Sequence, residues 1–312
     1  MHETDQIREV LNTDIRIPIP QALITRITSL PPFIPIQGVS NFRDISHDGN
    51  QLRPGFVYRS GNLSGILGPG KSIIATELGI TTIFDLRNEG ERRKAPAPSI
   101  TGVDTIWLPY GARPATLNLR DFAGPDKGAA GFVKMYFGVL EAAAPCFTEI
   151  FKHVRDNPDD PFIVHCSGMF YVYHLVPVAC EPYIYLANAN RNSPSTAGKD
   201  RTGVFAALIL LLINRPHDDI INDYILTRVE LESARENLMQ AFAVNLGPGG
   251  VDINQLSPEA LGMLELCGVR ATSMAAFLIS FEKSYRNGVE GYLIDRLGFT
   301  QGDVSTMRRN LI

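Results

Sequence analysis

The sequence predicts an α/β fold with a sheet flanked by helices and a helical C-terminal third. The first observation is that short β-like runs alternate with helical stretches between about residues 39 and 166. The second is the helical pattern that follows Asp200. The third is the composition: 45% of the 312 residues are hydrophobic and 20% are charged, which supplies a sizeable core and excludes a disordered or collagen-like chain.

Residues 1–37 are predicted to form an N-terminal arm and not a domain. Five prolines lie between Pro18 and Pro35, and they exclude a continuous helix or a central strand. Residues 38–312 are predicted to form a single domain, because α/β chains of about 250 residues often fold as one unit.

The alternating part of the chain contains four short runs that favour strands. They are Phe56–Tyr58, Thr81–Phe84, Thr105–Pro109 and the fully apolar Phe162–Val164. Helices are predicted around residues 73–78, where Gly79 gives a stop, and over residues 132–155. The last strand leads directly into His165 and Cys166, so these two residues are expected at one edge of the sheet.

After Asp200 only helices are predicted. The first two are expected over residues 202–213 and 219–243. Ser257 and Pro258 stand where an N-cap and a first helical residue belong, and Thr300 with Asp303 resembles a capping box. These signals account for the helical C-terminal third.

Charge and apolar runs exclude several classes of partner. The formal net charge of −4 lacks the broad positive surface of a nucleic-acid-binding protein. The longest apolar run, Val204–Ile213, is about half of the roughly 20 residues that span a bilayer, so no membrane span is predicted. The N-terminus lacks the parts of a signal peptide, and the four cysteines form no CxxC pair, so a cytoplasmic protein is expected.

Two separated segments resemble the halves of one phosphate-binding loop. The first segment is a strand that leads into His165-Cys166-Ser167. The second is Ala197-Gly198-Lys199-Asp200-Arg201-Thr202-Gly203, which opens an apolar helix. Removing Gly168–Thr196 joins the two segments into H-C-x5-R-T, the signature of protein tyrosine phosphatases. In such a loop the inward-pointing amides and the helix N-terminus bind a phosphate dianion and favour a cysteine thiolate. The arginine supplies a planar fork for two phosphate oxygens.

The 29 residues between these halves, 168–196, are interpreted as an aberrant insertion. They contain four tyrosines and three prolines but only Glu181 and Arg191 as charges, and they show no helical or strand period. Codons for Gly168–Phe170 can contain the intron donor GTATGT, and codons for Thr196 and Ala197 can contain an acceptor. The favoured interpretation is a translated, retained intron or a gene-model error, and the alternative is a genuine surface insertion.

With the halves joined, the chain resembles the atypical tyrosine/serine phosphatase family of bacteria and fungi over most of residues 33–310. The resemblance also depends on four ordered motifs, GVSNFRD at 38–44, LRPG at 52–55, YRSGNL at 58–63 and FDLR at 84–87. It implies a phosphatase-like α/β sheet and hydrolysis of phosphoric monoesters through a phosphocysteine, with no metal and no cofactor. The implied substrates are phosphotyrosine proteins and, in some members, phosphoserine, phosphothreonine or phosphoinositides.

The resemblance also implies roles for individual residues. Cys166 is the nucleophile, Arg201 binds the phosphate and Asp200 is the first choice for the general acid. Asp85 is the second choice, followed by Asp121 and Asp126 in a segment rich in proline and glycine. The predicted substrate-binding residues are His165, Ser167, Ala197, Gly198, Lys199, Thr202, Gly203, Arg59, Arg87 and Asp85. A helix that covers the pocket is expected at Asp219–Ala243.

Several of these residues have ordinary structural alternatives. Asp85 could pair with Arg43 or Arg59 in a salt bridge, and Asp121 and Asp126 could be solvated loop charges. His165 is expected to orient the loop through a hydrogen bond and not to act as a base. Arg59 and Arg87 could form salt bridges in place of flanking the phosphate, and Lys199 could only add positive potential.

Two other functions remain as alternatives. A catalytically dead, phosphate-binding module would result if the insertion breaks the loop. A sulfur-transfer enzyme on a rhodanese-like sheet also uses a loop cysteine, but it does not require the Lys-Asp-Arg-Thr-Gly sequence at 199–203. Cys146 and Cys267 lie on apolar helical faces and are predicted to be core thiols.

Overall fold

A computed structural model describes residues 3–46, 51–110, 117–167, 198–243 and 256–312. Within these residues the chain forms a five-stranded sheet with the order β1-β2-β5-β3-β4. The strands are β1 (Arg43–Asp44), β2 (Val57–Ser60), β3 (Thr82–Asp85), β4 (Asp104–Trp107) and β5 (Phe162–His165). Strands β2, β5, β3 and β4 run parallel, whereas β1 pairs antiparallel with β2. The fold is therefore α/β, as predicted.

The register of the parallel strands brings three of their carboxyl ends to one level. His165 at the end of β5 pairs with Ser60 of β2 on one side and with Asp85 of β3 on the other. Chain segments that leave these strands therefore meet at one edge of the sheet, which is where open parallel sheets bind ligands. Cys166, which follows His165, lies at this edge.

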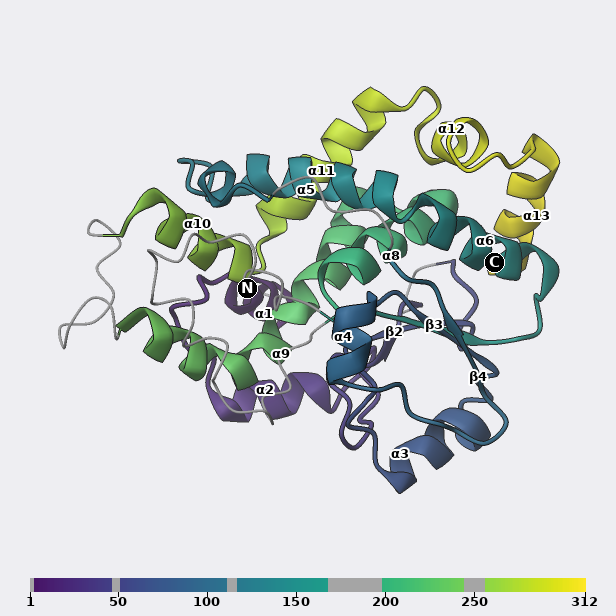
Figure 1. The fold of residues 1–312 in the computed structure, drawn as a ribbon, viewed down its shortest axis with the longest axis horizontal. Helices are drawn as coiled ribbons and strands as arrows, with labels where there is room; N and C mark the ends of the chain where they lie inside the picture. Colours follow the sequence, from purple (N-terminus) through teal and green to yellow (C-terminus); the bar gives the residue numbers. More distant parts are fainter. Residues whose placement is uncertain (1–2, 47–50, 111–116, 168–197, 244–255) are drawn as a thin grey trace.

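Between and after the strands, the described residues form helices. They are α3 (Gly68–Ser72), the π-helical η1 (Ile73–Glu77), α4 (Glu89–Lys94), the 3-10 helix η2 (Leu119–Phe122), α5 (Ala129–Ala142), α6 (Ala144–Asp156), α8 (Asp200–Leu212), α9 (His217–Ala243), α10 (Pro258–Cys267), α11 (Ala271–Ser284), α12 (Gly288–Asp295) and α13 (Gln301–Leu311). In Figure 1, α5, α6, α8 and α11 lie to one side of the sheet and α3 lies to the other.

Side chains of the central strand alternate between two cores. Phe162 and Val164 belong to the larger core, which also contains the apolar faces of α5, α6, α8 and α11. Ile163 points to the opposite face and belongs to a smaller core with Tyr58 and Ile83 of the neighbouring strands. Burial on both faces explains why the first three residues of β5, Phe162–Val164, are all apolar.

Most predicted elements are present, and the differences have local causes. The helical stretch 132–155 is two helices that meet at Ala143, because Pro145 stands in the first turn of α6 and fits only near a helix start. The N-cap at Ser257 and the capping box of Thr300 with Asp303 are confirmed. The sequence did not predict β1 or α4, since both are too short to show a period.

The N-terminal arm contains two helices, α1 (Glu3–Leu11) and α2 (Gln21–Thr28), which pack against α9. Leu11, Ile15 and Ile27 are buried in the larger core. Asp14 also pairs with Arg270 at the start of α11, with 2.6 Å between Oδ2 and Nη2. The prolines thus interrupt the arm, as predicted, without preventing short helices between them.

None of the described helices is both long enough and apolar enough to cross a membrane alone. The bent pair α10 and α11 meets these two criteria only when its helices are counted together, and they are inclined at 88° to each other.

Candidate active site

The two halves of the predicted loop lie together at the carboxyl edge of the sheet. Cys166 follows β5 and is 1% exposed, and Asp200 and Arg201 form the first turn of α8. The Arg201 guanidinium donates through Nη2 to the carbonyl oxygen of Ser167, the residue after Cys166. The segment 168–196, predicted to be an insertion, lies with Ala197 outside the described residues.

Gly198 holds the second half of the loop against β2. Its backbone has a φ of +58°, and a Cβ atom there would lie 2.0 Å from the carbonyl oxygen of Ser60. No side chain fits this approach, so the position requires glycine. The Gly198 carbonyl accepts a 2.8 Å hydrogen bond from Nη2 of Arg59, which fixes the loop in this place.

Arg201 is clamped by Glu91, a residue that the sequence analysis did not identify. Nη1 donates to Oε2 of Glu91 at 2.8 Å, and Nη2 donates to Oε1 at 2.6 Å. Nη1 also donates to the Leu86 carbonyl at 2.8 Å. Burial would lower the pKa of Arg201, but the negative charges of Cys166 and Glu91 and the hydrogen bonds to Glu91 raise it above its usual range. Arg201 is therefore a permanent cation beside Cys166.

Glu91 connects both halves of the loop to α4. In addition to Arg201, its Oε1 accepts a 2.5 Å hydrogen bond from the Ser167 hydroxyl. Its Oε2 accepts a 2.8 Å bond from the backbone N–H of Asn88, and Asn88 caps the Glu91 N–H in return. The sequence Asn88-x-x-Glu91 is a capping-box pattern, so the start of α4 could have been predicted. The ion pair between Glu91 and Arg201 could not have been predicted, because the two residues are far apart in the sequence.

Replacing Glu91 with glutamine is expected to damage both stability and catalysis. The glutamine N–H₂ group and one Arg201 nitrogen would then both be hydrogen-bond donors, so the bond between them would be lost. The buried Arg201 cation would also lose the negative charge that neutralises it. Breaking such a buried pair destabilises a protein by about 3 kcal/mol. We expect Glu91→Gln to reduce the unfolding free energy by about that amount, measured in urea, and to reduce kcat/KM at least about tenfold.

The matched control is Glu89→Gln, because Glu89 is exposed in the first turn of the same helix. It removes an equal charge without touching Arg201, and we expect wild-type stability within about 0.5 kcal/mol. Equal effects of the two substitutions would show that the Glu91 clamp contributes nothing specific.

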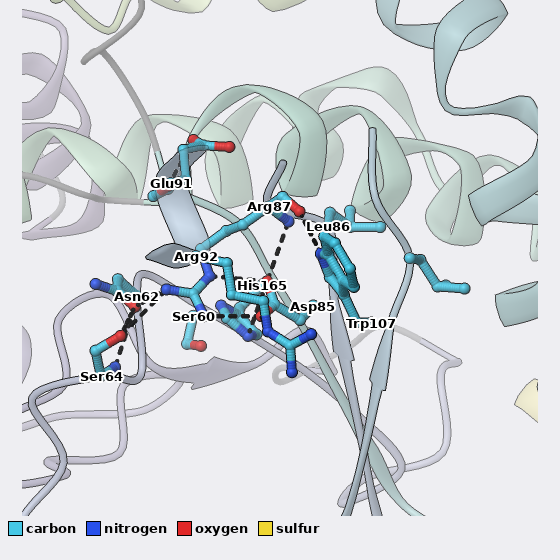
Figure 2. A network of polar contacts seen from close by, with 12 residues as sticks. Ser60, Asn62, Ser64, Asp85, Leu86, Arg87, Glu91, Arg92, Trp107 and His165 are labelled. Carbon is cyan, nitrogen blue, oxygen red and sulfur yellow. Dashed lines mark hydrogen bonds and ion pairs between the residues drawn. The ribbon is translucent and has the colours of Figure 1, made fainter. Parts of the chain in front are cut away.

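Asp85 and Arg87 form a fully buried ion pair at the carboxyl end of β3 (Figure 2). Arg87 donates to Asp85 through Nε at 2.8 Å and Nη2 at 2.7 Å, and its Nη1 donates to Asn62, Ser64 and the Ala95 carbonyl. Burial would raise the pKa of Asp85, but the hydrogen bonds from Arg87 and the charge of Arg87 lower it overall. Asp85 is therefore ionised.

The pair bears on three expectations. The Asp85 carboxyl is fully buried and accepts hydrogen bonds from Nε and Nη2 of Arg87, which argues against its role as the general acid. Its partner is Arg87, and not Arg43 or Arg59 as the structural alternative supposed. The contacts of Arg87 favour a supporting role over the predicted contact with phosphate, because its guanidinium is already bound on both edges.

His165 is fully buried beside this pair, with 3.6 Å between its Nε2 and Oδ1 of Asp85. Burial lowers its pKa to about 4, the charge of Asp85 opposes this shift, and the charges of Arg87 and Arg201 add to it. The imidazole is therefore neutral. Neither ring nitrogen has a hydrogen-bond partner in the described part of the chain, so the loop-orienting hydrogen bond expected of His165 is not seen.

Arg59 and Lys199 also donate hydrogen bonds within the protein. Arg59 donates to Asp223 of α9 and to Gly198, and the neighbouring Arg43 donates to the same Asp223 at 2.8 Å. Lys199 donates to the carbonyl oxygens of Leu266 at 2.7 Å and Gly268 at 3.0 Å, at the end of α10. These contacts argue against the predicted substrate contacts of both residues, because each charge serves to hold the loop in place.

The four candidates for the general acid differ in where their side chains lie and in what they contact. Asp200 lies at the N-terminus of α8, where its side chain is partly exposed and accepts a 3.0 Å hydrogen bond from the Tyr136 hydroxyl. Asp121 pairs with Lys134 at 2.6 Å, and Asp126 accepts from the Ala130 N–H at 2.7 Å. The last two side chains serve local contacts, as the structural alternative supposed. Asp200 is thus the candidate with a place in the loop.

The helix expected to cover the pocket is largely part of the core. In α9, Ile220, Tyr224, Ile225 and Val229 are buried, and Asp223 is anchored to Arg43. Moving this part of the helix would expose apolar surface and break a buried ion pair. The first half of α9 is therefore not a mobile lid.

Comparisons with known proteins agree with this arrangement. The family model described as the tyrosine phosphatase family matches residues 34–168 and 194–312. The chain is 27% identical over 295 residues to the triple specificity protein phosphatase PtpB of Mycobacterium tuberculosis, covering 89% of this chain and 98% of that protein. It is 25% identical over 276 residues to a Cupriavidus necator protein whose name places it among the tyrosine-protein phosphatases, covering 86% of this chain and 85% of that one.

Among solved structures, the core catalytic domain of the PP-IP phosphatase SIW14 from S. cerevisiae matches with a TM-score of 0.31 and 14% identity, covering 68% of this chain and 96% of that chain. The family model matches far more than half of the chain, and its two matched parts contain Cys166 and Arg201. The chain belongs to the tyrosine phosphatase family.

Proposed function

We propose that this chain hydrolyses phosphate monoesters through a phosphocysteine formed on Cys166. The observation that carries the proposal is the contact between the two halves of the loop, in which Arg201 of α8 donates to the carbonyl of Ser167. This contact brings a permanent cation and a helix N-terminus to the buried thiol. Such surroundings favour a thiolate nucleophile and bind a phosphate dianion.

The reaction has two steps. In the first, the Cys166 thiolate attacks phosphorus, the bond to the ester oxygen breaks, and Asp200 gives its proton to that oxygen. In the second, water attacks the phosphocysteine, Asp200 accepts a proton from the water, and the thiolate leaves. The Thr202 hydroxyl is buried and has no hydrogen-bond partner among the described residues, so it is available to stabilise the departing thiolate.

Arg201 must exchange partners when phosphate binds. Its terminal nitrogens are bonded to Glu91, Leu86 and Ser167 in this structure. A phosphate that takes the predicted two-oxygen contact has to displace part of this set. The Ser167 carbonyl is the partner we expect to yield, because Glu91 carries the charge that holds the guanidinium in place.

The proposed substrates are phosphotyrosine residues of proteins. A wider range, including phosphoserine, phosphothreonine or phosphoinositides, is part of the proposal because one relative is named a triple specificity protein phosphatase. Nucleic acid is not a proposed partner, given the net charge of −4. We also propose a cytoplasmic location, where the Cys166 thiol on which the mechanism depends stays reduced.

The test is hydrolysis of p-nitrophenyl phosphate by the purified full chain at high enzyme concentration in the presence of EDTA. We expect turnover, inhibition by vanadate and, after rapid acid quenching, a phosphate group on Cys166 detected by mass spectrometry. Phosphate found on another residue, or turnover only after a divalent metal is added, would refute the proposal.

A further inference from the structure

A chain of hydroxyl groups leads from the core to one oxygen of Asp200. The Tyr136 hydroxyl, from α5, donates to Asp200 Oδ1 at 3.0 Å and lies 2.7 Å from the Tyr224 hydroxyl of α9. Both tyrosines are at most 1% exposed. Because the single Tyr136 proton is given to Asp200, the second hydrogen bond must run from Tyr224 to the Tyr136 oxygen. The donors therefore point in one direction, toward Asp200.

The same oxygen also faces Lys199. The Lys199 ammonium lies 3.6 Å from Asp200 Oδ1, and its own hydrogen bonds go to the end of α10. Two side chains thus contact Oδ1, and none of the described residues donates a hydrogen bond to Oδ2. A carboxyl group held in this way keeps Oδ1 as its acceptor and places its proton on Oδ2.

We propose that Tyr136, supported by Tyr224, is a positioning residue that fixes Asp200 with Oδ2 as the proton-carrying oxygen of the reaction. The proposal rests on the proposed function, because it takes Asp200 as the general acid. In the first step the Oδ2 proton moves to the leaving oxygen as the P–O bond breaks and the S–P bond forms. In the second step Oδ2 accepts the proton of the attacking water. Tyr136 keeps its hydrogen bond to Oδ1 throughout.

The titratable groups around Asp200 determine the direction of the pH effect. Lys199, Tyr136 of α5, Tyr224 of α9, Tyr110 after β4 and Cys267 of α10 face it. Burial first, and then the nearby Tyr224 and Asp200, raise the pKa of Tyr136 well above its usual range. Tyr136 is therefore a neutral donor at all working pH values, and its hydrogen bond favours the ionised form of Asp200.

Tyr136→Phe removes this donor and keeps the ring. The ionised carboxylate loses support, so the protonated, active acid persists to higher pH. We expect the alkaline limb of the kcat/KM profile to move upward by about one pH unit. We also expect kcat to fall about tenfold for phenyl phosphate, whose leaving group needs a proton, but less than about threefold for a nitrophenyl ester. Tyr224→Phe should shift the limb in the same direction by a smaller amount.

The matched control is Tyr292→Phe. Tyr292 is as buried as Tyr136, and its hydroxyl donates to the Leu140 carbonyl at 3.0 Å, a contact outside the loop. Removal of the Tyr292 hydroxyl tests the effect of losing a buried tyrosine hydroxyl that does not contact Asp200. We expect this variant to leave the alkaline limb of the kcat/KM profile unshifted. A carbon-13 NMR titration of the carboxyl carbons in the full chain gives the same comparison without turnover, with the Asp200 signal assigned from Asp200→Asn.

The outcomes separate this proposal from the proposed function. If Asp200→Asn removes the alkaline limb and the leaving-group effect while Tyr136→Phe superposes on the wild type, the positioning role is wrong and the phosphatase mechanism stands. If Asp200→Asn changes neither, the assignment of the general acid fails. A shift of equal size in Tyr136→Phe and Tyr292→Phe would also overturn the positioning role, because it would reflect general loosening of the core.

Discussion

Cys166→Ser is expected to reduce turnover by about a thousandfold or more while the protein still binds phosphate. Cys166 is 1% exposed, lies at the carboxyl end of β5 and acts electrostatically on Arg201. A serine hydroxyl in its place is a much weaker nucleophile than a thiolate, because a hydroxyl stays protonated at neutral pH unless a base activates it. Removing the nucleophile of a covalent mechanism typically eliminates most of the rate enhancement. The loop amides and Arg201 remain, so binding of inorganic phosphate should persist in a calorimetric titration.

Cys146→Ser is the matched control for this substitution. Cys146 is also a buried free thiol, and its sulfur donates to the Leu108 carbonyl at 3.4 Å. Burial raises the pKa of Cys146, so it is a neutral thiol of the core, as predicted. We expect its turnover to stay within about threefold of the wild type. A near-native rate for Cys166→Ser would remove the basis of the phosphocysteine mechanism.

The sequence predicted the sheet and the loop because both depend on local signals. The short apolar run Phe162–Val164 predicts a strand that is buried on both faces, and β5 confirms this prediction. The second half of the loop is recognisable because Arg201 and Thr202 complete the signature H-C-x5-R-T once Gly168–Thr196 is removed. The close approach of Gly198 to Ser60 explains, in addition, why the loop has a glycine at this position.

The roles of the charged residues could not be predicted in the same way. Arg59, Arg87 and Lys199 all belong to motifs near the phosphate site, and a sequence shows the charge but not its partner. In the structure their partners are Asp223, Asp85 and the end of α10, between 2 and 164 residues away. The buried charges must be paired inside the protein, because an unpaired ion in the core is strongly destabilising. The pairing of Glu91 with Arg201 has the same physical reason, because the Arg201 cation is also buried and needs a negative partner.

Deleting Gly168–Thr196 is expected to raise the phosphatase rate at least about a hundredfold. The family model leaves residues 169–193 unmatched, almost the same segment that the signature H-C-x5-R-T requires to be absent. The deletion joins Ser167 to Ala197 and places five residues between Cys166 and Arg201, so the loop amides can all face one anion. In the full chain two of these amides belong to residues whose backbone must also lead into and out of 29 others. The loss of one hydrogen-bond donor from an anion hole raises the activation free energy by on the order of 3 kcal/mol. Two misplaced amides would therefore slow the reaction by more than the hundredfold difference that we predict.

The measurement is kcat/KM for p-nitrophenyl phosphate, compared between the full chain and the deletion variant. The control replaces residues 168–196 with a glycine-serine linker of equal length. If interruption of the loop is the cause, the linker variant should be as slow as the full chain, whereas a fast linker variant would assign the effect to the inserted sequence. Sequencing the transcript across Cys166 to Gly203 shows independently whether the cell removes the segment. Equal rates for the full chain and the deletion variant would establish the segment as a genuine part of the enzyme, because the anion site then forms with Ser167 and Ala197 far apart in the chain.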